Sequence, residues 1–136
     1  MQHYPLIDWV DAKCRTWGFE RRKLRRARAP HSPRLDEPIG HGIAPEPTEG
    51  LTGDALLVAV AIRRALEHHS LTLRQHAALY LHYDDRFRRI PARCKYADLS
   101  LRSRQGYYYL LSRAHKAIDS HWPTDIQYRQ DMALDR

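Results

Sequence analysis

A single stripe of apolar side chains between residues 103 and 118 constrains the fold of this chain more than any other feature. Tyr107, Leu111, Ala114 and Ile118 recur at the three- and four-residue spacing that places side chains on one face of an α-helix. Ser103 precedes the stripe, and a serine hydroxyl can accept a hydrogen bond from one of the free amide groups that open a helix. The spacing therefore predicts a helix that is capped by Ser103 and buried along one face.

The other side of this expected helix carries hydrogen-bonding and cationic side chains, which suit a helix lying in the major groove of DNA. There arginine can pair with guanine and glutamine with adenine, while tyrosine, serine and lysine can hold phosphates. An ordinary surface helix with a solvated basic face would show the same pattern, so the helix alone does not decide between the two. The expected groove-facing residues are Arg104, Gln105, Tyr108, Tyr109, Ser112, Arg113 and Lys116.

A second helix is expected to begin at Thr72. Residues 72–75 read Thr-Leu-Arg-Gln, the capping-box pattern in which the side chains of the first and fourth residues bond each other's backbone amides. Leu73, Ala77 and Tyr80, with Leu81 beside them, are then expected to form the inward stripe of this helix.

A short helix is expected between these two. Pro91 suits the first turn of a helix that runs to Leu99, and the small Ala97 beside Tyr96 would allow a close crossing of the next helix. Two helices that cross through a turn of a few residues form a helix-turn-helix. The connector from Asp84 to Arg93 supplies the expected phosphate contacts: Arg86, Arg88, Arg89 and Arg93.

The first 53 residues divide into a short helix, a basic arm and a linker. Pro5 suits a helix start, Trp9 and Trp17 follow a helical stripe, and Gly18 is expected to stop the helix. Six of the eight residues 21–28 are basic, and such an arm can track phosphates or enter a minor groove. Residues 30–53 hold five of the eight prolines and four of the six glycines, which favours a linker or an extended loop.

The second half of the chain is expected to hold the core. Asp54 is expected to cap a helix that ends near His68 and is central to the core because its first half is almost wholly apolar. Trp122 and Pro123 close the helix after Ser103, and the tail can be a short helix or a loose end. The expected organisation is all-α, with an N-terminal helix and basic arm (1–29), a linker (30–53), a helical DNA-binding domain (54–122) and a C-terminal tail (123–136).

The charge of the chain points to a polyanionic partner. The formal net charge is +7, and residues 71–122 carry ten basic against four acidic side chains. Nucleic acid is favoured over membrane as that partner, because the longest apolar run, residues 55–62, is far too short to cross a bilayer. The N-terminus shows no export-signal layout, so the expected location is the cytoplasm.

Catalytic and metal chemistry is not favoured. Cys14 and Cys94 do not form a Cys-x-x-Cys motif and are expected to be free thiols. The nine histidines lack the spacing of a zinc site and are expected on helix surfaces. Neither a metal nor a cofactor is therefore expected. A His-Asn-His nuclease is excluded because the chain contains no asparagine. Asp84 and Asp85 are an adjacent acidic pair that could bind Mg²⁺, but adjacent residues on a helix do not face each other, and salt bridges to the arginines that follow are the simpler expectation.

A resemblance to a known family rests on three groups of residues. Residues 81–83 read Leu-His-Tyr, Tyr96-Ala97 follows, and Ser103 then precedes the apolar stripe. This pattern resembles the region-four helix-turn-helix of bacterial sigma factors, in which an Ile-Ala pair precedes a serine that caps the recognition helix. The same module occurs in the late-gene antitermination Q proteins of lambdoid phages, and the early Trp17-Gly18 pair and the order of the helices resemble the smaller, zinc-free type of that family.

The resemblance implies a binding protein rather than an enzyme. Such a protein binds double-stranded DNA near a phage late promoter, joins the host bacterial RNA polymerase paused just downstream, and makes it read through terminators. A phage transcription activator or repressor that does not travel with the polymerase is the alternative. Contacts with the polymerase or with nascent RNA would come from N-terminal residues: Trp9, Trp17, Arg21, Arg22, Arg25 and Arg26.

Overall fold

The computed structural model describes residues 4–28, 46–84 and 104–134, and these ranges contain five α-helices and no strand. The helices are α1 (Asp8–Arg28), α2 (Gly53–Glu67), α3 (Leu73–Tyr83), α5 (Arg104–Ser120) and α6 (Thr124–Leu134). The expected all-α class is confirmed. No helix within these ranges is both long enough and apolar enough to span a bilayer.

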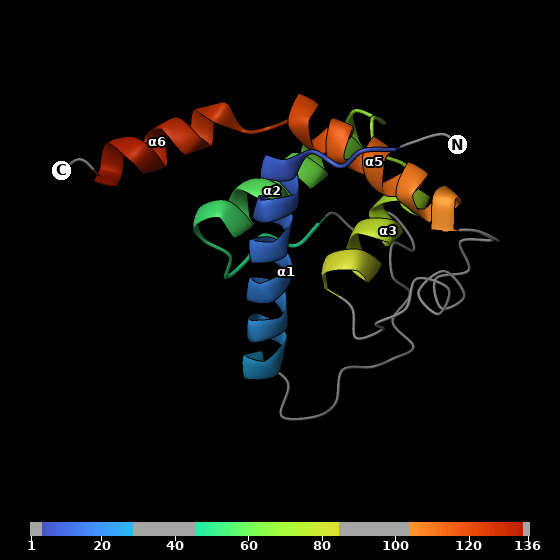
Figure 1. Cartoon of the computed structure of the whole chain (residues 1–136). Coiled ribbons are helices and arrows are strands. Elements are labelled where there is room, and N and C mark those ends of the chain that lie inside the picture. Colours follow the sequence, from blue (N-terminus) through green and yellow to red (C-terminus); the bar gives the residue numbers. More distant parts are fainter. Residues whose placement is uncertain (1–3, 29–45, 85–103, 135–136) are drawn as a thin grey trace.

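Four of these helices, α1, α2, α3 and α5, enclose one apolar core, and α2 is buried along much of its length. α2 packs against both α1 and α5, and α3 packs against α5 on the other side (Figure 1). Most of the small apolar residues of α2 are fully buried, among them Ala55, Val58 and Ile62, so the prediction that this helix belongs to the core is confirmed. α6 leads away from the other four helices and packs against α2.

α5 follows the predicted phase. The side chains of the four stripe residues between Tyr107 and Ile118 are fully buried. The helix begins at Arg104, directly after Ser103, and ends at Ser120, just before Trp122. Residues 85–103, which include the expected short helix and Arg86, Arg88, Arg89 and Arg93, lie outside the described residues, so the helix-turn-helix stays a prediction.

α3 has the predicted start but not all of the predicted stripe. Thr72 is the N-cap, its side chain accepts from the amide of Gln75, and the Gln75 side chain accepts from the amide of Thr72 at 3.0 Å. Leu73 was expected to face inward but is 51% exposed. The inward positions of the first turns are instead held by His76 and its neighbours, and Leu81 is buried as expected.

α1 runs further than predicted. It continues through Gly18 to Arg28, so residues 21–28 form the last turns of a helix rather than a separate arm. Gly18 lies against α3 so closely that an added Cβ would be 2.1 Å from the carbonyl oxygen of Tyr83. The glycine therefore permits the two helices to approach each other, and the expectation that it stops the helix is wrong.

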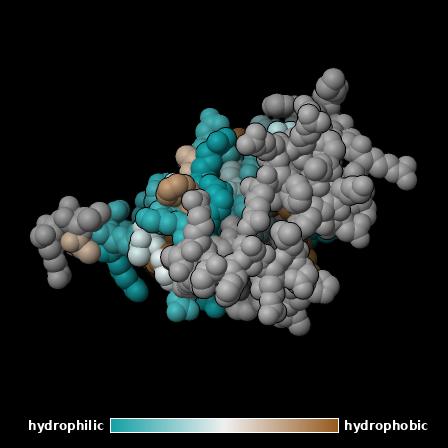
Figure 2. All heavy atoms as spheres, turned by 90° about the horizontal axis from the view of Figure 1, so that it is seen from below, coloured by the Kyte–Doolittle hydropathy of each residue, from teal (hydrophilic) through white to brown (hydrophobic). Residues whose placement is uncertain are grey.

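The segment before α2 is partly packed. The N-cap of α2 is Thr52 rather than Asp54, and Asp54 lies in the first turn, where it accepts a hydrogen bond from Lys13 at 2.9 Å. Glu46 and Leu51 are buried, so the last residues of the expected linker belong to the core, while residues 29–45 lie outside the described part. The described atoms on the face seen in Figure 2 are mostly hydrophilic, with small separate apolar spots.

Candidate nucleic-acid interface

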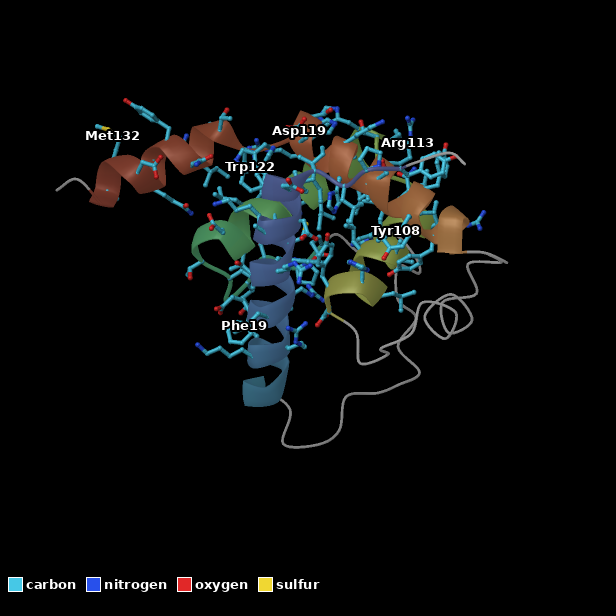
Figure 3. The ribbon with its side chains drawn as sticks, viewed as in Figure 1. Phe19, Tyr108, Arg113, Asp119, Trp122 and Met132 are labelled. Atoms are coloured by element: carbon cyan, nitrogen blue, oxygen red, sulfur yellow. The ribbon has the colours of Figure 1, made fainter. Side chains whose placement is uncertain are left out.

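The solvent-facing side of α5 is narrow and partly basic. Tyr109, Arg113 and Lys116 are exposed and follow one another at helical spacing along α5; Arg113 is labelled in Figure 3. Tyr109 is 44% exposed. Neither Arg113 nor Lys116 takes part in an ion pair with another described residue, so both cations face solvent without neutralisation. These three predicted DNA contacts share one face.

Ser112 does not belong to that face. Its side chain is buried, and its hydroxyl donates a hydrogen bond to the carbonyl oxygen of Pro5 at 3.2 Å. The predicted groove contact of Ser112 is therefore wrong, because the N-terminal segment covers this position. Tyr108 is half-buried at the edge of the face, where its ring lies beside those of His82 and Tyr107. The helix backbone at Arg104 and Gln105 is described, but their side chains are outside the described residues.

The N-terminal segment lies along α5, which the sequence did not indicate. The Tyr4 ring meets the Tyr109 ring edge to face, with 5.1 Å between the ring centroids. The backbone N–H of Ile7 donates to Nδ1 of His115 at 3.1 Å. Together with the bond between Ser112 and Pro5, these contacts attach residues 4–7 to the helix at three successive points.

His115 begins a chain of buried hydrogen bonds. Because Nδ1 accepts from Ile7, a neutral His115 carries its proton on Nε2 and donates it to the Tyr83 hydroxyl, 2.7 Å away. The Tyr83 hydroxyl in turn donates to Asp11 Oδ1 at 2.7 Å. Burial lowers the pKa of His115 to about 4, although the charge of Asp11 opposes this shift. The chain thus joins the N-terminal segment, α5, α3 and α1 while the imidazole is neutral.

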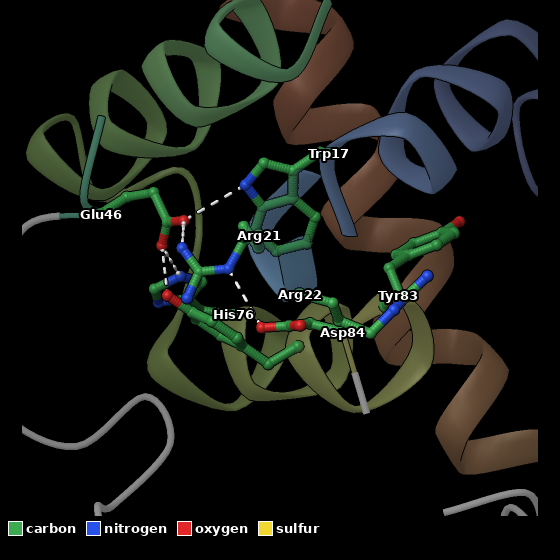
Figure 4. A network of polar contacts seen from close by, with 8 residues as sticks. Trp17, Arg21, Arg22, Glu46, His76, Tyr83 and Asp84 are labelled. Carbon is green, nitrogen blue, oxygen red and sulfur yellow. Dashed lines mark hydrogen bonds and ion pairs between the residues drawn. The ribbon is translucent and has the colours of Figure 1, made fainter. Parts of the chain in front are cut away.

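A second polar network occupies the region predicted to contact polymerase or RNA. Glu46 is fully buried, and its carboxylate accepts from Arg21 Nη1 at 2.7 Å and from the Trp17 indole at 3.3 Å (Figure 4). The same carboxylate bonds the Tyr80 hydroxyl at 2.7 Å and His76 Nε2 at 3.0 Å. Arg21 also donates through Nε to the buried Asp84 at 3.1 Å.

These contacts correct the polymerase or RNA expectation for two residues. Trp17 is fully buried in the core, and the Arg21 guanidinium lies between two carboxylates and over the Tyr80 ring, so neither side chain is available to a partner. Arg22 donates to the carbonyl oxygen of Tyr83. Trp9 is 40% exposed and packs edge to face on Trp122, whereas the side chains of Arg25 and Arg26 lie outside the described residues.

Two of the histidines are placed differently from the expectation, and Asp84 has a partner that was not expected. His76 and His115 are buried within the two networks rather than on helix surfaces. Asp84 pairs with Arg21 of α1, and the arginines that follow it lie outside the described residues. Over the described ranges no three histidine, cysteine or acidic side chains are grouped as metal ligands would be. Cys14 is a buried free thiol, and Cys94 lies outside the described residues.

No family model, curated protein or solved structure matches the chain.

Proposed function

We propose that this chain binds double-stranded DNA through the exposed face of α5 and acts as a phage transcription antitermination factor. Support for DNA binding comes from one observation above all: Tyr109, Arg113 and Lys116 share a solvent-facing side of a helix that is braced by the core. The antitermination role is supported by the resemblance of residues 54–120 to the late-gene antitermination Q proteins of lambdoid phages.

The dimensions of this face suit the major groove. Lys116 lies seven positions after Tyr109, which at about 1.5 Å per residue is roughly 10 Å along the helix axis. The major groove of B-DNA is about 12 Å wide, which admits one α-helix because the diameter of a helix with its side chains is about 10–12 Å. The two cations would reach phosphates or base edges, and the tyrosine ring would lie against sugar or base.

The antitermination role adds a second partner. In this proposal the DNA-bound protein joins the host RNA polymerase at a pause, travels with it through terminators, and makes or breaks no covalent bond. It would act in the bacterial cytoplasm. Trp9, which is partly exposed beside Trp122, is the one predicted polymerase-contacting residue whose ring is described at the surface.

The first test is DNA binding by the purified protein. Fragments of the source genome are incubated with the protein at moderate salt, and the bound fragments are recovered and sequenced. We expect one discrete site beside a promoter. Indiscriminate recovery that disappears as salt rises would overturn sequence-specific binding.

Variants then locate the binding face. Arg113→Ala and Lys116→Ala are each expected to weaken binding to the recovered site, and Lys116→Ala should reduce the slope of log affinity against log salt by about one unit if it holds a phosphate. Arg129→Ala is the matched control, because Arg129 is an exposed arginine on α6. Equal affinity of all three variants and the wild type would place the DNA site elsewhere.

A terminator read-through assay separates antitermination from the alternative. A template carrying the recovered site, its promoter and a downstream terminator is transcribed with and without the protein. Read-through supports antitermination. Altered initiation with unchanged termination would favour an activator or repressor that does not travel with the polymerase.

A further inference from the structure

The N-terminal segment lies along α5 beside the face that carries the exposed Tyr109, Arg113 and Lys116, and it contacts that face only at Tyr109 among the described residues. Three contacts hold it: Tyr4 on Tyr109, the Pro5 carbonyl on Ser112, and the Ile7 amide on His115. The partners on α5 are spaced by three residues, so the segment follows the helix for about two turns. Tyr4, the first described residue, lies against the exposed Tyr109.

The three contacts between the N-terminal segment and α5 differ in how deeply they are buried. Ser112 and His115 are buried beneath the segment, whereas Tyr109 is 44% exposed and Tyr4 is half-buried. The two deeper contacts therefore anchor the segment, and the outer contact is made at the surface. An edge-to-face ring pair has a preferred geometry, so Tyr4 restricts the orientations available to the Tyr109 ring.

We propose that Tyr4 is a positioning residue of the DNA-binding face, which orients the Tyr109 ring toward double-stranded DNA. This inference rests on the proposed DNA-binding function of α5. Tyr109 precedes Arg113 by one helical turn, so a fixed Tyr109 ring sets one end of the face and the two cations set the other. The N-terminal segment is then an integral part of the interface, although it lies about a hundred residues away in the sequence.

The alternative for this segment is a purely structural role, in which it covers the buried side of α5. Both roles predict that deep contacts such as Ile7 to His115 stabilise the fold. The two roles make different predictions for Tyr4. Only in the positioning role does loss of the Tyr4 ring weaken DNA binding when Tyr109 is present and have no further effect when Tyr109 is absent.

A double-mutant cycle tests this dependence. Affinity for the recovered site is measured for the wild type, Tyr4→Ala, Tyr109→Ala and the double variant. Tyr4→Ala is expected to weaken binding by between about twofold and tenfold, the range that corresponds to an aromatic pair of this geometry. The double variant should bind no more weakly than Tyr109→Ala alone, because Tyr4 has no ring left to orient.

Conservative and remote variants complete the design. Tyr4→Phe keeps the ring and should bind like the wild type. Tyr128→Ala removes a tyrosine that is 66% exposed on α6 and should leave affinity unchanged. If Tyr4→Ala lowers the melting temperature, Tyr4→Leu, which keeps the apolar bulk without the ring, replaces it in the cycle.

The possible results separate the two proposals. The positioning role is overturned if the losses of DNA affinity in Tyr4→Ala and Tyr109→Ala are fully additive, or if Tyr4→Ala binds DNA like the wild type. In either case Arg113→Ala and Lys116→Ala would still weaken binding, and the proposed function would stand. If those two cation variants bind like the wild type, the proposed function itself fails. An unchanged salt slope in Tyr4→Ala is also expected, because a tyrosine releases no counterions.

Discussion

Arg21 Nη1 lies 2.7 Å from Glu46 Oε1, and this ion pair joins the middle of α1 to the segment that precedes α2. The carboxylate is fully buried, and the guanidinium also binds Asp84 at the end of α3. Arg21 therefore connects three parts of the chain that are distant in sequence. Such a network is stabilising only while each member keeps its partners.

Glu46→Ala should strongly destabilise the protein. The substitution removes the acceptor of Trp17, Tyr80 and His76 and leaves Arg21 with Asp84 alone. Removal of one partner of a buried ion pair costs roughly 3–5 kcal/mol. The free energy of unfolding in urea measures this loss.

Lys13→Ala provides the control for this prediction. It breaks the partly exposed ion pair between Lys13 and Asp54, which should cost at most about 1 kcal/mol. Equal losses for the two variants would contradict the buried network around Glu46.

Gly18→Ala should destabilise the protein although alanine favours helices. Helix propensity alone would favour the alanine by about 1 kcal/mol. The added Cβ would lie 2.1 Å from the carbonyl oxygen of Tyr83, however, so α1 and α3 must separate. Forced shifts of this kind cost about 1–3 kcal/mol, so we expect a lower melting temperature.

Thr16→Ala is the comparison, since Thr16 is an exposed residue of the same helix. Its melting temperature should remain close to that of the wild type. A higher melting temperature for Gly18→Ala would mean that the two backbones do not approach each other as described.

Features that depend on neighbours in sequence could be predicted. The stripe from Tyr107 to Ile118 follows from helical spacing, and the capping box of Thr72 and Gln75 is complete within four residues. Both were recognisable because the interactions that select them are local.

Features that depend on tertiary contact could not be predicted in the same way. A glycine is a common helix stop, but Gly18 continues its helix because α3 packs on it. Arg21 belongs to a basic run, and nothing in that run indicates a carboxylate 25 residues later. The cover over Ser112 comes from Pro5, 107 residues away, so helical spacing alone assigned this serine to the solvent face.

Cys14 should react slowly with thiol reagents in the folded protein. Burial raises the pKa of the Cys14 thiol, so almost none of it is present as the reactive thiolate near neutral pH. In a Cys94→Ser background, a chromogenic disulfide reagent reports Cys14 alone. We expect labelling only as fast as the protein opens, and rapid labelling in denaturant. Rapid reaction of the native protein near pH 8 would refute the burial of this thiol.

The stability of the protein should fall between pH 6.5 and pH 4 because of His115. Burial lowers the pKa of this imidazole from 6.5 to about 4 in the folded state, so the unfolded chain takes up its proton first as the pH falls. The contribution of the neutral His115 to the free energy of unfolding is complete above pH 6.5. It decreases by about 1.4 kcal/mol per pH unit below that pH, a loss of roughly 3 kcal/mol by pH 4. The pKa of Asp11 is lowered from 3.8 in the folded protein, so its own contribution is lost below this window.

Urea unfolding of the wild type and His115→Gln across this pH range measures the contribution. His115→Gln should be less stable than the wild type at pH 7, because it breaks the bonds to Ile7 and Tyr83, and the difference should shrink as the pH approaches 4. His68→Gln removes an exposed histidine and should keep the slope of the wild type. Parallel curves for the wild type and His115→Gln would show that His115 is free to protonate in the folded state, which is incompatible with its position between a backbone amide and the Tyr83 hydroxyl.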